Sequence, residues 1–231
     1  DTLSRNLESR LERLNFDAVT QRWTNYYGHI DLAAIARAGN NWAEKFTGER
    51  EQALISVLSE VPAGTLLDVG ANNGYFSMLG AHCGFTTTAV DYDIGAIDGL
   101  YRLLKSTGST LPIRPFVMDF AKFDENLWSR FSSDVVFALG FTHHMRLVEL
   151  LPWPVIAAQL SSLTGKVLVT EFKPGTLAVD SKHKMTGDVT DDYTRLQLVA
   201  ALEAHFPSVE IIGDFTAMDS VSARTMIICR R

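Results

Sequence analysis

The chain has 231 residues, of which 46% are hydrophobic and 21% are charged, and its formal net charge at pH 7 is −6. These values fit a globular protein of one domain, or of one domain with an appendage. The acidic balance disfavours general nucleic-acid binding, because phosphate backbones are bound by clustered Lys and Arg. The sequence contains no run of 18 apolar residues and no signal-peptide pattern, so we expect no membrane span and a cytoplasmic location.

The two cysteines, Cys83 and Cys229, lie in apolar surroundings, far apart in sequence and without the spacing of metal ligands. We therefore expect two buried thiols in a reducing compartment, and we assign no metal. The first residue is Asp1 rather than Met, which leaves open processing or excision from a longer protein.

Residues 1–48 predict a helical extension. Leucines spaced four, four and three residues apart form one face of an amphipathic helix over residues 3–14. That face would pack on the domain or on a partner subunit, and a homodimer through these helices is the sharper alternative. The ring-bearing residues that follow suit either a cap over a substrate pocket or anchors to the core: Trp23, Tyr26, Tyr27, His29 and Trp42.

Residues 49–231 predict one α/β domain, because short apolar runs alternate with helical stretches as in a mostly parallel sheet. Strands are expected at residues 65–69, 86–90, 114–118, 134–139, 166–172, 209–215 and 223–230. Helices are expected at residues 49–60, 75–83, 94–105, 125–131, 154–163 and 192–205. The last two strands suit a hairpin with one antiparallel strand. We expect residues 141–151 to form a loop with a short turn, and residues 173–191 to form a long polar loop that could act as a lid.

The stretch from Thr65 to Phe76 is the feature around which the domain is organised. Its apolar run ends at Asp68, and Gly70 and Gly74 then flank three small residues. Glycine allows close approach of a ligand and backbone angles that a Cβ disfavours, and the helix that follows offers unpaired N–H groups. The pattern predicts a nucleotide-type site at the carboxyl end of a strand.

Two further acids end the next predicted strands, and ligands of open α/β sheets bind at such ends. Asp91 follows Gly70 by 21 residues, where a carboxylate can accept hydrogen bonds from both ribose hydroxyls. Asp119 could accept from an adenine amino group, or it could simply cap the next helix. A buried Asp68 would repel a pyrophosphate and attract an ammonium or sulfonium group, which favours a cationic-sulfur ligand over NAD.

These motifs resemble those of class I S-adenosylmethionine-dependent methyltransferases, which have a Rossmann-like fold with a seven-stranded sheet and an antiparallel last strand. The resemblance covers residues 50–231 and rests on Leu66-Leu-Asp-Val-Gly-Ala-Asn-Asn-Gly74, Ala89-Val-Asp-Tyr-Asp93, Val117-Met-Asp-Phe120 and Asp134-Val-Val-Phe-Ala-Leu139. It implies S-adenosylmethionine as cofactor, bound by Asp68, Gly70, Asn72, Gly74, Asp91, Tyr92 (or Ile94), Asp119, Phe120 and Leu139. Asn72 stands where many members have glycine.

Phe141-Thr-His-His-Met145 follows the fourth predicted strand, where the transferable methyl group should point. If the acceptor is a hydroxyl, His143 or His144 could take its proton as a general base. The alternative is that one histidine pins the loop and the other is solvated. A metal held by one of them with Glu171 is a further reading without diagnostic spacing.

A bacterial branch of the same superfamily is similar in a softer way, through Thr142-His-His, Thr170-Glu-Phe-Lys-Pro174 and Asp191-Asp-Tyr-Thr194. Its members lie near biosynthetic and cell-surface-saccharide genes, and it implies that Glu171, Lys173 and Tyr193 edge the acceptor pocket. The primary hypothesis is a methyltransferase acting on a small-molecule, saccharide or carrier-bound acceptor, more readily at oxygen than at nitrogen or carbon. The alternatives are a non-catalytic domain of this fold in a larger assembly and a nicotinamide-dependent oxidoreductase.

Overall fold

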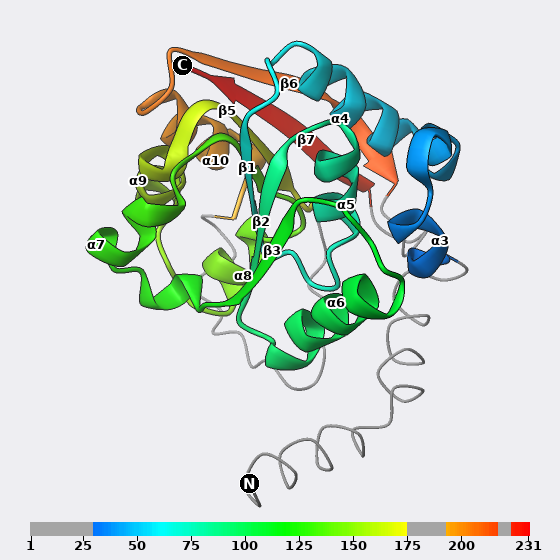
Figure 1. The fold of residues 1–231 in the computed structure, drawn as a ribbon. Helices are drawn as coiled ribbons and strands as arrows, with labels where there is room; N and C mark the ends of the chain where they lie inside the picture. Colours follow the sequence, from blue (N-terminus) through cyan, green and yellow to red (C-terminus); the bar gives the residue numbers. More distant parts are fainter. Residues whose placement is uncertain (1–29, 175–192, 217–222) are drawn as a thin grey trace, which may run out of the picture.

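The computed structural model describes residues 30–174, 193–216 and 223–231, which form a seven-stranded sheet with helices on both faces (Figure 1). The strands are β1 (Thr65–Val69), β2 (Thr86–Asp91), β3 (Ile113–Val117), β4 (Ser133–Ala138), β5 (Thr164–Phe172), β6 (Ser208–Thr216) and β7 (Ala223–Arg230). Their order is β3-β2-β1-β4-β5-β7-β6, and β7 is antiparallel to both of its neighbours. The expected α/β class and the antiparallel last strand are therefore confirmed.

The described helices follow the expected alternation with the strands. They are α3 (Leu32–Ala36), α4 (Glu49–Ser59), α5 (Tyr75–His82), α6 (Ile94–Ser106), α7 (Glu125–Trp128), α8 (Thr142–Leu147), α9 (Trp153–Leu163) and α10 (Arg195–Glu203), with short 3-10 segments η1 (Gly39–Lys45), η2 (Phe120–Lys122) and η3 (Ser129–Phe131). None of these helices is long and apolar enough to cross a membrane.

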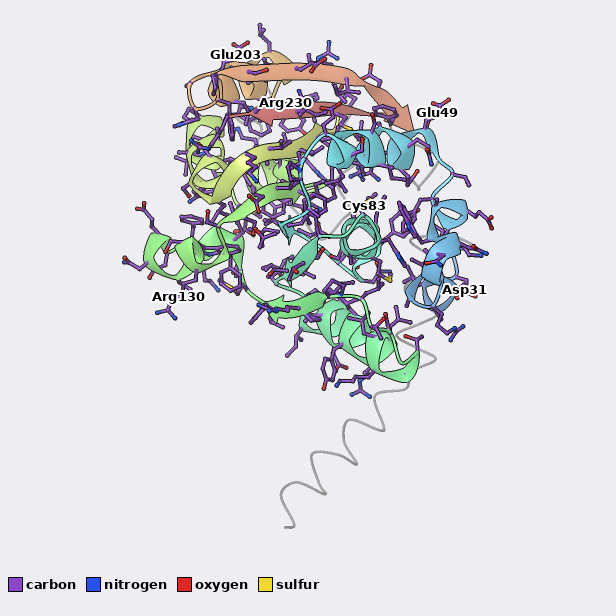
Figure 2. All side chains as sticks on the ribbon, turned by 45° about the horizontal axis from the view of Figure 1, so that its top comes forward. Asp31, Glu49, Cys83, Arg130, Glu203 and Arg230 are labelled. Carbon is purple, nitrogen blue, oxygen red and sulfur yellow. The ribbon has the colours of Figure 1, made fainter. Side chains whose placement is uncertain are left out.

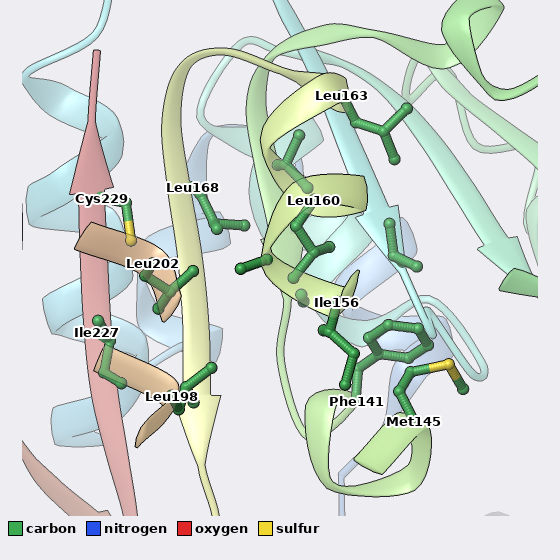
Figure 3. Close-up of a cluster of buried hydrophobic side chains, with 14 of the residues drawn as sticks. Phe141, Met145, Ile156, Leu160, Leu163, Leu168, Leu198, Leu202, Ile227 and Cys229 are labelled. Carbon is green, nitrogen blue, oxygen red and sulfur yellow. The ribbon is translucent and has the colours of Figure 1, made fainter. Parts of the chain in front are cut away.

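Two buried clusters, one on each face of the sheet, hold the layers together. Alternate residues of a strand point to opposite faces, so Leu67 packs with α9 and α10 while Leu66 packs with α4 and α5. Figure 3 shows the first cluster, in which Leu160 of α9 and Leu202 of α10 face Leu168 of β5. Because both faces are covered, the ligand-accessible part of a central strand is its carboxyl end.

Residues 30–48 pack onto the second cluster, and Figure 2 shows Asp31 and Glu49 on the side of the molecule where Cys83 lies. Phe46 is 0% exposed, and the Trp42 ring stacks on His82 at 5.7 Å between centroids. Trp42 is thus an anchor to the core. Nε2 of His82 is within hydrogen-bonding distance, 2.9 Å, of the Ile35 carbonyl oxygen.

Three differences from the sequence predictions concern local elements. Residues 142–147 form helix α8 rather than an irregular loop, because Thr142, Met145 and Leu147 have an apolar surface to bury against. The helix expected at 125–131 is divided into α7 and η3. Cys83 is half-buried rather than buried, while Cys229 is fully buried.

Some predicted features lie outside the described residues. These are the amphipathic helix over residues 3–14 with its proposed homodimer, the side chains Trp23, Tyr26, Tyr27 and His29, and most of the proposed lid at residues 173–191.

Candidate active site

The turn after β1 has the backbone that its glycines predict. Gly70 and Gly74 adopt φ angles of 75° and 79°, and Asn72 between them is also left-handed at 52°. A Cβ on Gly70 would lie 2.9 Å from Phe141 Cδ2, and one on Gly74 would lie 2.6 Å from Leu100 Cδ1. Both angles and both close approaches disfavour any side chain. The N-terminus of α5, which follows Gly74, has no capping side chain.

The asparagines of this turn carry buried polar atoms without partners. Asn73 is only 3% exposed, and among the described residues neither its Oδ1 nor its Nδ2 has a hydrogen-bond partner. Oδ1 of Asn72 is buried and unpartnered as well. Buried polar atoms of this kind are costly unless a ligand or water satisfies them. The turn therefore offers both donors and acceptors to a polar ligand.

Asp68 ends β1 beneath the turn and is 2% exposed. Its Oδ2 accepts a hydrogen bond of 2.6 Å from the Ser77 hydroxyl of α5. The pKa of Asp68 is raised to about 7, mainly by burial and also by the nearby charge of Asp91, while the Ser77 hydrogen bonds and the Arg50 charge oppose the rise. No cation of the described part of the chain forms an ion pair with this carboxyl, so it is suited to pair with a positively charged ligand group.

Asp91, at the end of β2, ties the turn to the neighbouring strand. Its Oδ2 accepts from the backbone N–H of Asn72 at 2.8 Å, and its Oδ1 accepts from the N–H of Asp93 at 2.9 Å. Burial is the main cause that raises the pKa of Asp91. A carboxylate has about four acceptor sites, so Asp91 can also accept from ligand hydroxyls.

The residues expected around an adenine fall into an exposed and a buried group. Tyr92 and Ile94, which follow β2, are about 70% and 71% exposed. Desolvation, Asp91 and Asp119 all raise the pKa of Tyr92, which places the two strand ends near one another. Asp119 accepts a hydrogen bond from the N–H of Ala121 and so caps η2, which was the alternative prediction for this residue. It also forms an ion pair with Lys122.

The other two predicted adenine contacts are core side chains. Phe120 is buried and packs edge-on against Phe141 and Trp128, with centroids 5.0 and 5.1 Å away. Leu139 is buried in the cluster that contains α5. They can support the floor of a pocket, while Tyr92 and Ile94 supply its open apolar surface.

Glu171, at the carboxyl end of β5, is 1% exposed and is the centre of a charge network. Arg50 of α4 binds it in a bidentate manner, with Nε and Nη2 at 2.7 and 2.8 Å from its two oxygens. The same carboxylate accepts the N–H of Gly140 at 3.0 Å, and Arg224 Nη1 lies 3.6 Å away. Glu171 thus fixes the ends of β4 and β5 against α4.

The two predicted histidines lie on α8, next to this network. His143 is half-buried and His144 is exposed, with ring centroids 4.4 Å apart. Thr142 holds the start of the helix by donating a 2.6 Å hydrogen bond to the Glu171 carbonyl oxygen. Burial, followed by the charges of His144, Arg224 and Lys173, lowers the pKa of His143 to about 2, so its imidazole is neutral.

Tyr193 and Lys173 also lie at this edge of the sheet. The Tyr193 hydroxyl donates to the Lys173 carbonyl oxygen at 2.8 Å, and its ring packs on Phe172 and Trp153. The ring and hydroxyl of Tyr193 therefore order the chain after β5. The positive charge of Lys173 contributes to the lowered pKa of His143, after burial and the charges of His144 and Arg224.

Sequence reasoning did not find Arg50, Asn73, Ser77 or Arg224. Asn73 had a signal, since it lies inside the glycine turn. Arg50 and Arg224 had none, because each reads as an ordinary cation until the fold brings it to Glu171.

No protein-family description matches the chain. The nodulation protein NoeA of Rhizobium meliloti (strain 1021) is 25% identical over 186 residues, which are 72% of this chain and 39% of NoeA. The chain thus spans well under half the length of that relative.

Several solved structures share the fold. Magnesium protoporphyrin IX methyltransferase (ChlM) from Synechocystis PCC 6803 with bound SAM superposes with a TM-score of 0.58 at 14% identity, covering 98% of this chain and 96% of ChlM. The N-terminal domain of EvdMO1 with SAH and D-fucose gives 0.56 at 16%, over 79% and 81% of the two chains. The bifunctional kinase-methyltransferase WbdD gives 0.57 at 18%, over 78% and 38%. With its strand order and its glycine turn, the chain has the fold of the class I S-adenosylmethionine-dependent methyltransferases.

Proposed function

We propose that the protein transfers a methyl group from S-adenosylmethionine to a small-molecule, saccharide or carrier-bound acceptor. The observation that carries the proposal is the turn from Gly70 to Gly74, in which the buried amide atoms of Asn73 have no partner among the described residues. Asp68 ends the strand before this turn, and Asp91 accepts a hydrogen bond from the N–H of Asn72 within it. When bound, S-adenosylmethionine supplies an electrophilic methyl group on a sulfonium centre.

The residues present fit that ligand. Asp68 pairs with its ammonium, the turn from Gly70 through Asn72 to Gly74 holds the methionine part, and Asp91 accepts from the ribose hydroxyls. Around the adenine we place Tyr92 or Ile94, Asp119, Phe120 and Leu139. Catalysis then rests mainly on alignment of acceptor and methyl group, since in-line displacement depends on geometry.

We place the acceptor beyond the ends of β4 and β5, where Glu171, Lys173 and Tyr193 frame the space next to α8. Oxygen is the preferred acceptor atom, with His143 or His144 taking the proton of a hydroxyl. His143 is neutral and so can accept a proton, although its low pKa opposes holding one. A saccharide acceptor is supported by the D-fucose in the EvdMO1 domain structure.

The cofactor assignment is tested by calorimetry with S-adenosylhomocysteine, the demethylated product. We expect saturable binding to the wild-type chain, and Asp91→Asn to weaken it roughly 10- to 100-fold because a charged acceptor for two hydroxyls is lost. Asp98→Asn is the matched control, since Asp98 lies on α6 and pairs with Arg102 on the surface. Absence of binding at millimolar ligand, or preferential binding of NADH, would overturn the proposal.

A further inference from the structure

Arg224, at the start of β7, is a buried cation with one nitrogen that has no hydrogen-bond partner among the described residues. Its side chain is 7% exposed, and its guanidinium packs directly on the backbone of Gly140. Among the described residues its Nε has no hydrogen-bond partner. Because a guanidinium stays protonated in proteins, this burial needs a compensating anion.

Glu171, the nearest carboxylate, is already occupied by other partners. Arg50 takes both of its oxygens in short, parallel hydrogen bonds, and Gly140 donates to one of them as well. Arg224 reaches Glu171 only at 3.6 Å, beyond good hydrogen-bond length. Two guanidinium groups therefore share one negative charge.

Within residues 30–174, 193–216 and 223–231, the other charged groups that act with Arg224 on its neighbours are positive. The charges of Arg224 and Lys173 act together on His143, and Arg224 also acts on Tyr193. The remaining buried carboxylates among the described residues, Glu51 and Asp68, contact Tyr75 and Ser77 instead. Counted over the residues that the structure describes, the result is a local positive charge in a chain whose net charge is −6.

We propose that Arg224, with Lys173 beside it, binds an anionic group of the methyl acceptor, either a carboxylate or a phosphate. The proposal rests on the function proposed above. It adds that the methyl acceptor carries a negative charge, which the sequence did not indicate. Arg224 lies where an acceptor is expected, since Thr225 next to it pairs with Phe172 at the carboxyl end of β5. The planar fork of a guanidinium matches both kinds of oxyanion.

An anion at this position also affects His143. Burial is the largest cause of the low pKa of His143 in the free protein, and the positive charges of His144, Arg224 and Lys173 lower that pKa as well. A bound carboxylate or phosphate offsets those charges and makes the imidazole a better proton acceptor. A bound anion would thus favour the protonated form of the proposed base, His143.

The test is an NMR titration of the full chain saturated with S-adenosylhomocysteine. The probes are D-glucuronate for a carboxylate, D-glucose 6-phosphate for a phosphate, and D-glucose as the neutral match. We expect at least one anionic sugar to shift the Arg224 Nε–H and Gly140 N–H signals and to bind roughly tenfold or more tightly than glucose. Whichever anionic probe binds more tightly identifies the group.

Arg224→Gln should remove the preference for the anionic probe, as followed at Gly140. Arg230→Gln is the matched control on the same strand. Arg230, which is labelled in Figure 2, forms surface ion pairs with Glu60 and Glu210. Equal binding of charged and neutral probes to the wild-type chain, or an unchanged preference in Arg224→Gln, would overturn the proposal whatever the stability of the variant. If S-adenosylhomocysteine fails to bind, the proposed function fails, and the same titration of the free chain still decides the anion subsite.

Discussion

Asp68 lowers the stability of the free protein through its burial, and it is also the proposed partner of a cationic ligand group. Its carboxyl is fully buried, its hydrogen bond comes from the neutral Ser77 hydroxyl, and its pKa is about 7. In the unfolded chain the same group ionises near 3.8. Between pH 3.8 and about 7, Asp68 is therefore protonated in the folded chain and ionised in the unfolded chain. A bound cationic ligand favours the ionised carboxylate.

We predict that the affinity for S-adenosylhomocysteine rises with pH up to about 7 and levels off above it. Below the pKa the ligand ammonium must displace the proton of Asp68, so affinity should fall by up to about tenfold for each pH unit. Calorimetry between pH 5.5 and 8.5 measures this slope. In Asp68→Asn the affinity should be weaker at pH 8 and the slope absent; a slope that persists in this variant contradicts the assignment.

The stability of the free protein should change in the opposite sense. As pH rises from about 4 to 7, the unfolded chain gains by ionising Asp68 and the folded chain does not, so this group lowers the free energy of unfolding. Asp68→Asn, which keeps an acceptor for Ser77, should be the more stable protein above pH 7. The sequence indicated that Asp68 belongs to the ligand site, because Asp68 lies next to the glycine turn along the chain.

At the scale of elements, the Arg50–Glu171 pair joins helix α4 to strand β5. The two side chains are 7% and 1% exposed, and the Arg50 guanidinium also lies 4.5 Å from the centroid of the Phe76 ring. Removing one member of a buried pair leaves an uncompensated charge, which costs far more than losing a surface pair.

We predict that Arg50→Gln lowers the free energy of unfolding by about 3–5 kcal/mol. The matched control is Arg102→Gln, which removes an i, i+4 pair with Asp98 on the surface of α6 and should cost about 0.2–1 kcal/mol. Chemical denaturation followed by circular dichroism measures both. Similar losses for the two variants would show that the buried pair contributes no more than a surface pair.

At the scale of the whole molecule, residues 30–48 pack against the second buried cluster of the sheet. Phe46 is fully buried among Trp42, Tyr75 and His82, and Ile35 belongs to the same cluster. Tyr75 is the first residue of α5, directly after the glycine turn. Residues 30–48 therefore support the helix that begins the proposed cofactor site.

We predict that Phe46→Ala destabilises the protein by about 3–5 kcal/mol, through lost burial and the cavity left behind. The unfolding transition should remain single, with fluorescence and circular dichroism coinciding, because the segment shares the core of the sheet. Leu196→Ala is the control, since Leu196 is exposed and should change stability by less than about 0.5 kcal/mol. Separate transitions for the two probes would mean that residues 30–48 unfold independently.

Much of the fold and of the proposed cofactor site was present in the sequence as local pattern. Apolar runs mark buried strands, an acid at a strand end marks the ligand edge, and paired glycines mark backbone angles that a Cβ resists. The expectation of a loop over residues 141–151 was wrong in part, because α8 gains its helical form from packing on β5 and α9.

What the sequence by itself determined is the alternation of strands and helices and the turn from Gly70 to Gly74, since each is specified by neighbouring residues. The tertiary structure alone decided that Arg50, Glu171 and Arg224 share one buried site. Arg50 and Glu171 are 121 residues apart, and no local propensity records such a contact. The strand order places β7 beside β5, and the antiparallel direction of β7 brings its first residues to the carboxyl end of β5, where an acceptor would bind.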